Sequence, residues 1–317
     1  MAQATPVPID RKSAAVDAQR LRERATYASL AVAAILIVAK FAAWIGTGSV
    51  ALLSSLVDSL VDLAASLVTF FAVRQAAVPP DREHRFGHGK AEPLAALAQS
   101  AFLSGSALWL MAEAIRRLIS PEPVDNPPAG IAVMVFSMIV TVALVAYQRH
   151  VVKRTGSLAV GADELHYRGD ILFNLGVIAT LAISGRWDVP LLDPLFGAVV
   201  GIWIIHGAVK IARLSLTQLM DRELPDDERA RVRAIAESHS EVTAVHDIRT
   251  RGAGPTAFIQ LHIEMDGAMT LLCAHEISDA VEQELRAAFP HAEIIIHADP
   301  AGIEEYVAFP APRAAVR

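Results

Sequence analysis

Long stretches of apolar and small residues in the first two thirds of the chain limit what it can fold into. Most of them approach the ~20 residues that a helix needs to cross the hydrocarbon core of a bilayer. They cover residues 25–39, 49–73, 94–112, 130–147, 171–184 and 191–209. The first continues to about Trp44 and the fifth starts near Ser157. The sequence therefore predicts a membrane domain of six transmembrane helices over residues 25–217.

Lys and Arg residues are distributed unevenly between these stretches. Twelve lie in the N-terminal arm and in the loops after the second and fourth stretches, whereas the opposite loops hold three. Because positively charged loops stay in the cytoplasm, we expect both termini to be cytoplasmic. Residues 1–24 are polar and charged and have no apolar signal-peptide core, which predicts a disordered arm.

The composition changes at about residue 218. Between residues 221 and 299 there are 16 Asp and Glu, seven Arg and no Lys. This acidic balance argues against nucleic-acid binding, which requires a basic face, and is compatible with binding cations. Residues 218–300 are therefore expected to form a separate cytoplasmic domain, followed by a flexible tail over residues 301–317.

The pattern of this domain is that of a small α+β fold. Acidic residues open a helix at Asp226, as the helix dipole favours. Two strand-like segments over 242–250 and 256–265 flank a Gly-rich turn, which is typical of a hairpin. An amphipathic helix over 270–289 and a strand over 293–297 follow. The predicted order is α-β-β-α-β, close to a ferredoxin-like sheet.

Ionisable residues in the second and fifth apolar stretches form two pairs. Asp58 and Asp62 are four residues apart, as are His166 and Asp170, so each pair shares one helix face. Two carboxylates this close in a low-dielectric setting cannot both stay ionised without a cation or a proton between them. Four oxygen and imidazole ligands suit a tetrahedral ion such as Zn²⁺. The alternative is an interhelical polar network without an ion.

Two further groups of candidate ligands lie outside the apolar stretches. In the loop after the second stretch, Asp81, His84 and His88 have a spacing that a short irregular loop can bring around one ion, although a solvated charged loop remains an alternative. The acidic domain contributes four histidines and one carboxylate: His246, His262, His275, His297 and Asp299. The last two are two residues apart on one strand and therefore face the same side.

Seven motifs follow one another along the chain: Gly48–Val50, Leu56–Asp62, Phe86–Glu92, Ala162–Tyr167, Leu219–Arg222, His246–Arg251 and Ile295–Pro300. With these motifs the chain resembles the cation diffusion facilitators, and among them the bacterial zinc exporters, over about residues 20–300. The resemblance implies a homodimer in the bacterial inner membrane, with six spans per subunit and a metallochaperone-like cytoplasmic domain.

The same resemblance implies roles for individual residues. The transport site corresponds to Asp58, Asp62, His166 and Asp170, and the loop site to Asp81, His84 and His88. A two-metal cytoplasmic site corresponds to His246, His262, His275, His297 and Asp299, with Asp299 bridging the ions. Lys90 and Asp221 match the charged pair that holds the subunits together near the membrane surface. Ala298 departs from the pattern, because relatives can have a polar side chain there.

The resulting hypothesis is a secondary transporter that moves Zn²⁺ out of the cytoplasm in exchange for protons, by alternating access. Cd²⁺ and Fe²⁺ remain possible ions, whereas all-oxygen sites suit Mn²⁺ better. A metal-gated channel or membrane sensor is a rival interpretation, and predicts no saturable proton-coupled exchange. An enzyme is disfavoured, because the chain has no His-Glu-x-x-His helix of a metalloprotease.

Overall fold

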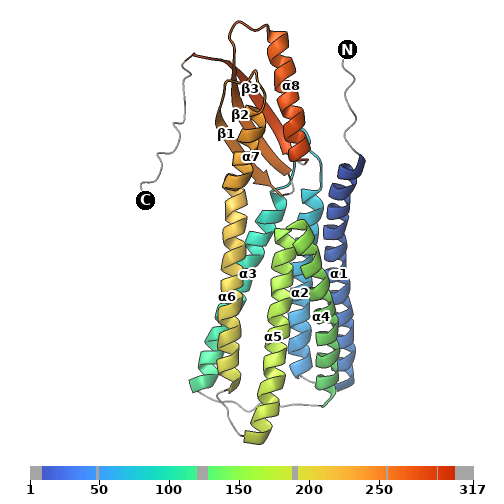
Figure 1. The fold of residues 1–317 in the computed structure, drawn as a ribbon. Helices are drawn as coiled ribbons and strands as arrows, with labels where there is room; N and C mark the ends of the chain where they lie inside the picture. The colour runs from blue at the N-terminus through green and yellow to red at the C-terminus, as the bar shows by residue number, and fades with distance from the viewer. Residues whose placement is uncertain are drawn as a thin grey trace. The chain divides into compact units, whose positions relative to one another are not determined.

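The computed structural model describes residues 9–47, 50–119, 128–187, 192–254, 256–290 and 292–303. The chain divides into two compact units, residues 1–217 and residues 218–317. Each unit is described by itself. The first is helical and the second combines helices with a sheet (Figure 1).

Six long helices form the first unit: α1 (Ile9–Thr47), α2 (Val50–Ala76), α3 (Ala91–Ile119), α4 (Pro128–Thr155), α5 (Leu158–Trp187) and α6 (Leu192–Leu219). Within the described residues, all but α5 contain an apolar segment long enough to cross a membrane. The fifth helix carries Asp163, Glu164, Arg168 and Asp170, which lower its apolar character. Asp163 and Glu164 are nonetheless buried among the other helices. The predicted helical membrane domain is confirmed.

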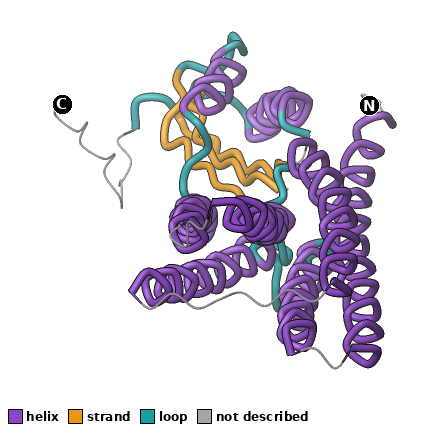
Figure 2. The backbone as a smooth tube through the Cα atoms, turned by 90° about the horizontal axis from the view of Figure 1, so that it is seen from below, coloured by secondary structure: helices purple, strands orange, loops and turns teal. Residues whose placement is uncertain are grey.

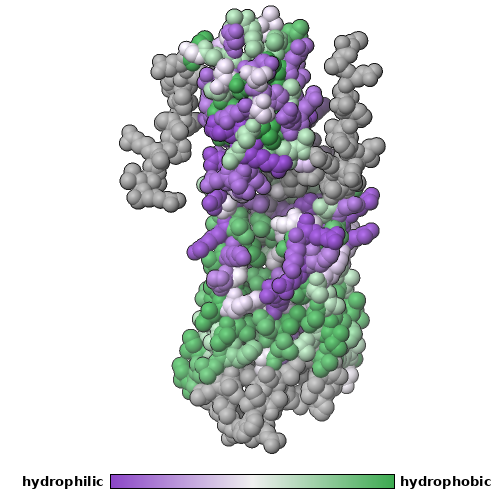
Figure 3. All heavy atoms as spheres, viewed as in Figure 1, coloured by the Kyte–Doolittle hydropathy of each residue, from purple (hydrophilic) through white to green (hydrophobic). Residues whose placement is uncertain are grey.

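Large apolar side chains cover the outside of this unit. Phe71, Trp109, Ile139 and Val199 are each more than half exposed. Figure 3 shows hydrophobic side chains gathered over the helices on the face in view. Exposed apolar surface on this scale marks a surface that water does not solvate. In a membrane protein this surface faces the lipid tails.

The first helix extends further toward the N-terminus than the apolar stretch that predicted it. Residues 9–24, for which we expected a disordered arm, belong to α1. Leu21 and Ala25 pack against the cluster of Val151 and Val160, which explains why the helix continues here. The rest of the expected arm, residues 1–8, lies outside the described residues, as do residues 304–317 of the expected tail.

The second unit contains α7 (Asp226–Glu237), β1 (Ala244–Ala253), β2 (Thr256–Met265), α8 (Leu271–Ala288) and β3 (Ala292–Pro300). This confirms the predicted α-β-β-α-β order. The strands lie in the order β1-β2-β3, with β1 antiparallel and β3 parallel to β2. The Thr270 side chain caps α8 by accepting a hydrogen bond from the Cys273 backbone N–H.

The two faces of this sheet differ in character. Helices α7 and α8 lie on the same side of the sheet (Figures 1 and 2). There Val232 and Val281 of the helices pack with Ile259, Leu261 and Ile263 of β2 in one core. Because side chains alternate along a strand, the residues between these three in β2 face the opposite side. That side carries the histidines.

Candidate metal sites

The Asp62 and His166 side chains meet between α2 and α5. His166 Nε2 lies 2.8 Å from Asp62 Oδ1 and 3.9 Å from Asp170 Oδ2. Donor atoms of these three residues all lie within 4.8 Å of one another. The helical spacing places His166 and Asp170 on one face of α5, and that face lies against the Asp62 side of α2. The arrangement provides two oxygen donors and one nitrogen donor around one point.

Asp58, the fourth member of the predicted quartet, lies one helical turn away on α2. It lines the same cavity as the other three, which has a volume of about 630 Å³. Its donor atoms are not among the group within 4.8 Å. The structure therefore brings three members of the quartet together and places the fourth on the wall of their common cavity.

Lys40 of α1 also lines this cavity, although sequence reasoning did not include it in the site. Its Nζ donates hydrogen bonds to the Ser55 carbonyl oxygen at 3.0 Å and to Ser59 Oγ at 2.7 Å. A single cation within a long apolar helix was the available signal. Its ammonium group offsets part of the negative charge of the carboxylates in the cavity.

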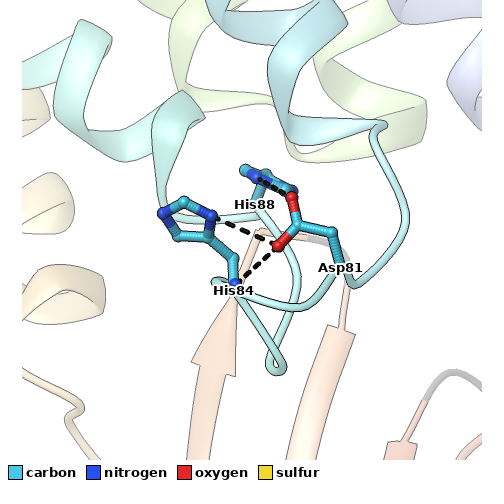
Figure 4. Close-up of side chains that lie close together, drawn as sticks. All are labelled: Asp81, His84 and His88. Atoms are coloured by element: carbon cyan, nitrogen blue, oxygen red, sulfur yellow. Dashed lines mark hydrogen bonds and ion pairs between the residues drawn. The ribbon is translucent and has the colours of Figure 1, made fainter.

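The loop site lies between α2 and α3 (Figure 4). His84 Nδ1 is 3.5 Å from Asp81 Oδ1, and His88 Nε2 is 3.5 Å from Asp81 Oδ2. The turn that brings the two histidines together includes Gly87, whose φ of 76° lies in the left-handed region that favours glycine. One carboxylate and two imidazoles thus lie around one point.

The Asp81 carboxylate is held by the backbone of its own loop. Its Oδ1 accepts hydrogen bonds from the N–H groups of His84 at 2.6 Å and Glu83 at 2.9 Å. The bond from the His84 N–H, more than any other contact, holds the pKa of the Asp81 carboxyl below its usual value. The carboxylate is therefore held charged and in one orientation by its own loop.

Three histidines lie side by side on the helix-free face of the sheet. His246 of β1 pairs with His262 of β2, which in turn pairs with His297 of β3. Neighbouring ring centroids are 5.1 Å and 4.7 Å apart. This register explains how residues far apart in sequence form one row.

Asp299 lies beneath this row and contacts all three imidazoles. Its Oδ2 is 2.8 Å from His262 Nδ1 and 3.5 Å from His246 Nε2, and its Oδ1 is 3.0 Å from His297 Nε2. The Asp299 side chain is only 5% exposed. A carboxylate this buried requires positive charge nearby, which protonated histidines or metal ions can provide.

Asp247 approaches the same row, and sequence reasoning did not select it. Its Oδ2 is 3.8 Å from His262 Nε2 and 2.9 Å from Arg249 Nη2. Asp247 directly follows His246, so regular alternation would place it on the other face of the sheet. The pairing of β1 and β2 shifts between His246 and Arg249, and Asp247 has a φ of 44°. This bulge is what turns its carboxylate toward the histidines.

The remaining predicted residues lie elsewhere. His275 is on α8, where its Nε2 is 3.6 Å from Asp279 Oδ2, and it does not join the row of histidines in the described part of the chain. Lys90 directly precedes α3. Asp221 Oδ1 accepts a hydrogen bond from Arg251 Nη1 at 3.2 Å.

Comparison with known proteins finds matches over both units. A family model described as the cation efflux transmembrane domain matches residues 26–220, and one described as the cytoplasmic domain of cation efflux proteins matches residues 224–301. The cation-efflux pump FieF of Serratia proteamaculans (strain 568) is 48% identical over 284 residues, which are 90% of this chain and 94% of that relative.

The cation-efflux pump FieF of Escherichia coli (strain K12 / DH10B) is 46% identical over 285 residues, which are 90% of this chain and 94% of that relative. Among solved structures, one described as the zinc form of the putative zinc transporter CzrB is 34% identical. The match covers 27% of this chain and 99% of the CzrB chain, with a TM-score of 0.26.

Proposed function

The chain belongs to the cation efflux family, and we propose that it exports Zn²⁺ from the cytoplasm in exchange for protons. As a member of this family it is a multi-pass membrane transporter and not an enzyme. The observation that carries the proposal is the contact of Asp62, His166 and Asp170 across two membrane helices. We propose the bacterial inner membrane as its location, with both termini in the cytoplasm.

The choice of Zn²⁺ rests on the ligand types. One imidazole nitrogen with carboxylate oxygens suits a four-coordinate, borderline-soft ion. Asp58, on the wall of the same cavity, is the fourth ligand in this proposal. Cd²⁺ and Fe²⁺ accept a similar ligand set, whereas Mn²⁺ favours oxygen ligands.

Coupling to protons follows from the chemistry of these ligands. Carboxylates and imidazoles bind a metal ion only when they are deprotonated, so metal binding releases protons. When the cavity opens outward, protons compete for the same atoms and displace the ion. The return of the protonated site then completes the exchange. Alternating access of one site is sufficient for this cycle.

The loop and sheet sites act on the transporter from the cytoplasmic side in this proposal. Zinc on His246, His262, His297 and Asp299, with Asp299 as the bridging ligand and His275 as a further one, stabilises a homodimer. Lys90 and Asp221 form the charged pair between subunits, and the loop site of Asp81, His84 and His88 binds an additional ion. Cytoplasmic zinc would in this way favour the active dimer.

Zinc flux into proteoliposomes tests the exchange. Vesicles with an acidic lumen and a fixed external pH should take up Zn²⁺ faster than vesicles without a gradient, and their lumen should become less acidic as zinc enters. An ionophore that collapses the gradient serves as the control and should remove the acceleration. Uptake that is independent of the gradient would refute proton exchange.

A further inference from the structure

A second set of contacts joins α2 and α5 one helical turn from the Asp62–His166 pair. Ser66 is four residues after Asp62, and Asp163 is three residues before His166, so each lies on the same helix face as its partner in the ion site. Ser66 Oγ donates a hydrogen bond to Asp163 Oδ1 at 3.2 Å. Two pairs of side chains therefore connect α2 and α5, one at the ion site and one a helical turn away from it.

The Asp163 side chain also accepts hydrogen bonds from two other helices. Ser29 Oγ of α1 and Gln148 Nε2 of α4 each donate a hydrogen bond to Asp163 Oδ2 at 2.7 Å. Gln148 Nε2 also lies 2.9 Å from Ser29 Oγ. One carboxylate of α5 thus accepts hydrogen bonds from side chains of α1, α2 and α4.

Burial makes these contacts strongly dependent on geometry. Asp163 is 1% exposed, and Ser29, Ser66 and Gln148 are 1% exposed or less. Tyr167 Oη, also buried, lies 3.0 Å from Ser66 Oγ and closes the network on the α5 side. A buried carboxylate that loses its donors is strongly destabilised, because the apolar surroundings offer no replacement.

Rotation of α5 would break this network. Asp163 accepts hydrogen bonds from donors on three different helices. Even a small rotation of α5 about its axis would therefore move the carboxylate away from some of them. His166 lies on the same face one turn further and would move with it. The Asp163 hydrogen bonds therefore fix the angle at which His166 Nε2 faces Asp62.

We propose that Asp163 is a positioning residue of the ion site, and that Ser29, Ser66 and Gln148 act through it. This inference rests on the proposed role of Asp62, His166 and Asp170 as the transported ion's ligands. Tetrahedral Zn²⁺ requires fixed ligand positions, whereas a loosened site loses this preference. Weakening the hydrogen bonds to Asp163 should therefore reduce discrimination of Zn²⁺ from Mn²⁺, in addition to lowering zinc affinity.

Equilibrium binding of Zn²⁺ and Mn²⁺ to the purified full-length chain in detergent tests this proposal. The binding component that Asp62→Asn removes defines the ion site. Asp163→Asn should weaken zinc binding in that component by about 10–100-fold, the range seen when a residue that orients metal ligands is lost. Manganese binding should change less, so the Zn²⁺/Mn²⁺ affinity ratio should fall.

Two further variants keep the test decisive. Ser66→Ala removes one donor hydroxyl and should also weaken zinc binding and lower the Zn²⁺/Mn²⁺ affinity ratio. It provides the test if Asp163→Asn does not fold. Ser100→Ala is the matched control, because this buried serine bonds to the Leu97 carbonyl oxygen of its own helix. It should leave both affinities unchanged.

A double variant tests positioning against a general loss of stability. Asp163→Asn combined with Gln148→Glu exchanges acceptor and donor between α5 and α4, and should restore most of the lost zinc affinity and ion discrimination. Asp163→Asn and Ser66→Ala proteins that retain the wild-type affinity ratio would overturn the proposal, as would a double variant without recovery. If Asp62→Asn removed no binding component, the proposed transport site itself would be wrong.

Discussion

At the scale of single residues, we propose that the ligand type of His166 decides the ion preference. His166 Nε2 is the nitrogen donor of the proposed membrane site and lies 2.8 Å from Asp62 Oδ1. His166→Asp makes the site all-oxygen, which suits Mn²⁺ better than Zn²⁺. We expect zinc affinity to fall by at least about 10-fold relative to manganese affinity, as measured by competition on the purified chain. His150→Asp, at an exposed position of α4, is the control; an unchanged ratio in His166→Asp would contradict the assignment.

The Asp81 carboxylate is the basis of a prediction about pH. Its pKa is lowered in the folded loop, first by the His84 backbone N–H. The loop contacts that depend on the charged form are therefore fully present above the unfolded pKa of about 3.9 and are lost as pH falls through the lowered folded value. An NMR titration of the Asp81 carboxyl carbon should give a midpoint below 3.9 on this reference scale. A midpoint at or above the ordinary value would show that the backbone contacts do not hold in solution.

Residue spacing predicted which side chains could meet, within limits. Asp62, His166 and Asp170 followed from their positions on helix faces, because helical spacing is regular. The donors around Asp163 did not follow, since contacts among α1, α2, α4 and α5 depend on how four helices pack. Asp247 was missed for a different reason: a bulge, which has no periodic signal, turns its side chain toward the histidines.

At the scale of elements, the N-terminal extension of α1 is held by a buried ion pair. Arg22 Nη1 lies 3.4 Å from Glu92 Oε2 of α3, and both side chains are 6% exposed or less. Arg22→Ala leaves the Glu92 carboxylate buried without its partner and should destabilise the fold by about 3–5 kcal/mol. Thermal unfolding in detergent should show a lower Tm.

Two comparisons support the interpretation of that variant. Arg20→Ala changes an exposed arginine of the same helix and should leave the Tm unchanged. Arg22→Ala combined with Glu92→Ala removes the unpaired charge and should recover part of the loss. A Tm of Arg22→Ala equal to that of the wild type would mean that this pair does not hold the helix extension.

The row of histidines on the sheet is the basis of a prediction about metal stoichiometry. His262 is the central histidine of the row and contacts Asp299 at 2.8 Å. His262→Ala should reduce the zinc bound by the full-length chain by at least one equivalent, because it removes the central of the three histidine ligands. Equilibrium dialysis with metal analysis measures this, and His150→Ala is the control. Unchanged zinc content would exclude the row as a binding site.

The order of elements was predictable because each has a strong local pattern. Long apolar stretches defined the membrane helices, and the alternation and turn residues after Asp226 defined the α-β-β-α-β order. The start of α1 was not predictable from polarity alone. Residues 9–24 are polar for most of their length, and their helix depends on the packing of Leu21 and on Arg22 reaching Glu92 in another helix.

At the scale of the whole molecule, the chain combines a membrane unit with an acidic metal-binding unit. The first places a carboxylate and imidazole site inside a cavity of about 630 Å³ between helices. The second places three histidines around a buried carboxylate on one face of a sheet. In the proposed function the first site carries the transported ion, and the second site is not itself on the transport path.

Initial rates of zinc uptake into proteoliposomes test whether the first site carries the transported ion. Asp62→Asn removes the charge of one ligand, whereas Asp226→Asn changes a fully exposed carboxylate of the second unit and serves as the control. Asp62→Asn should lower uptake to the level of protein-free vesicles, while Asp226→Asn should retain the wild-type rate. Wild-type uptake by correctly folded Asp62→Asn protein would contradict the proposed transport site.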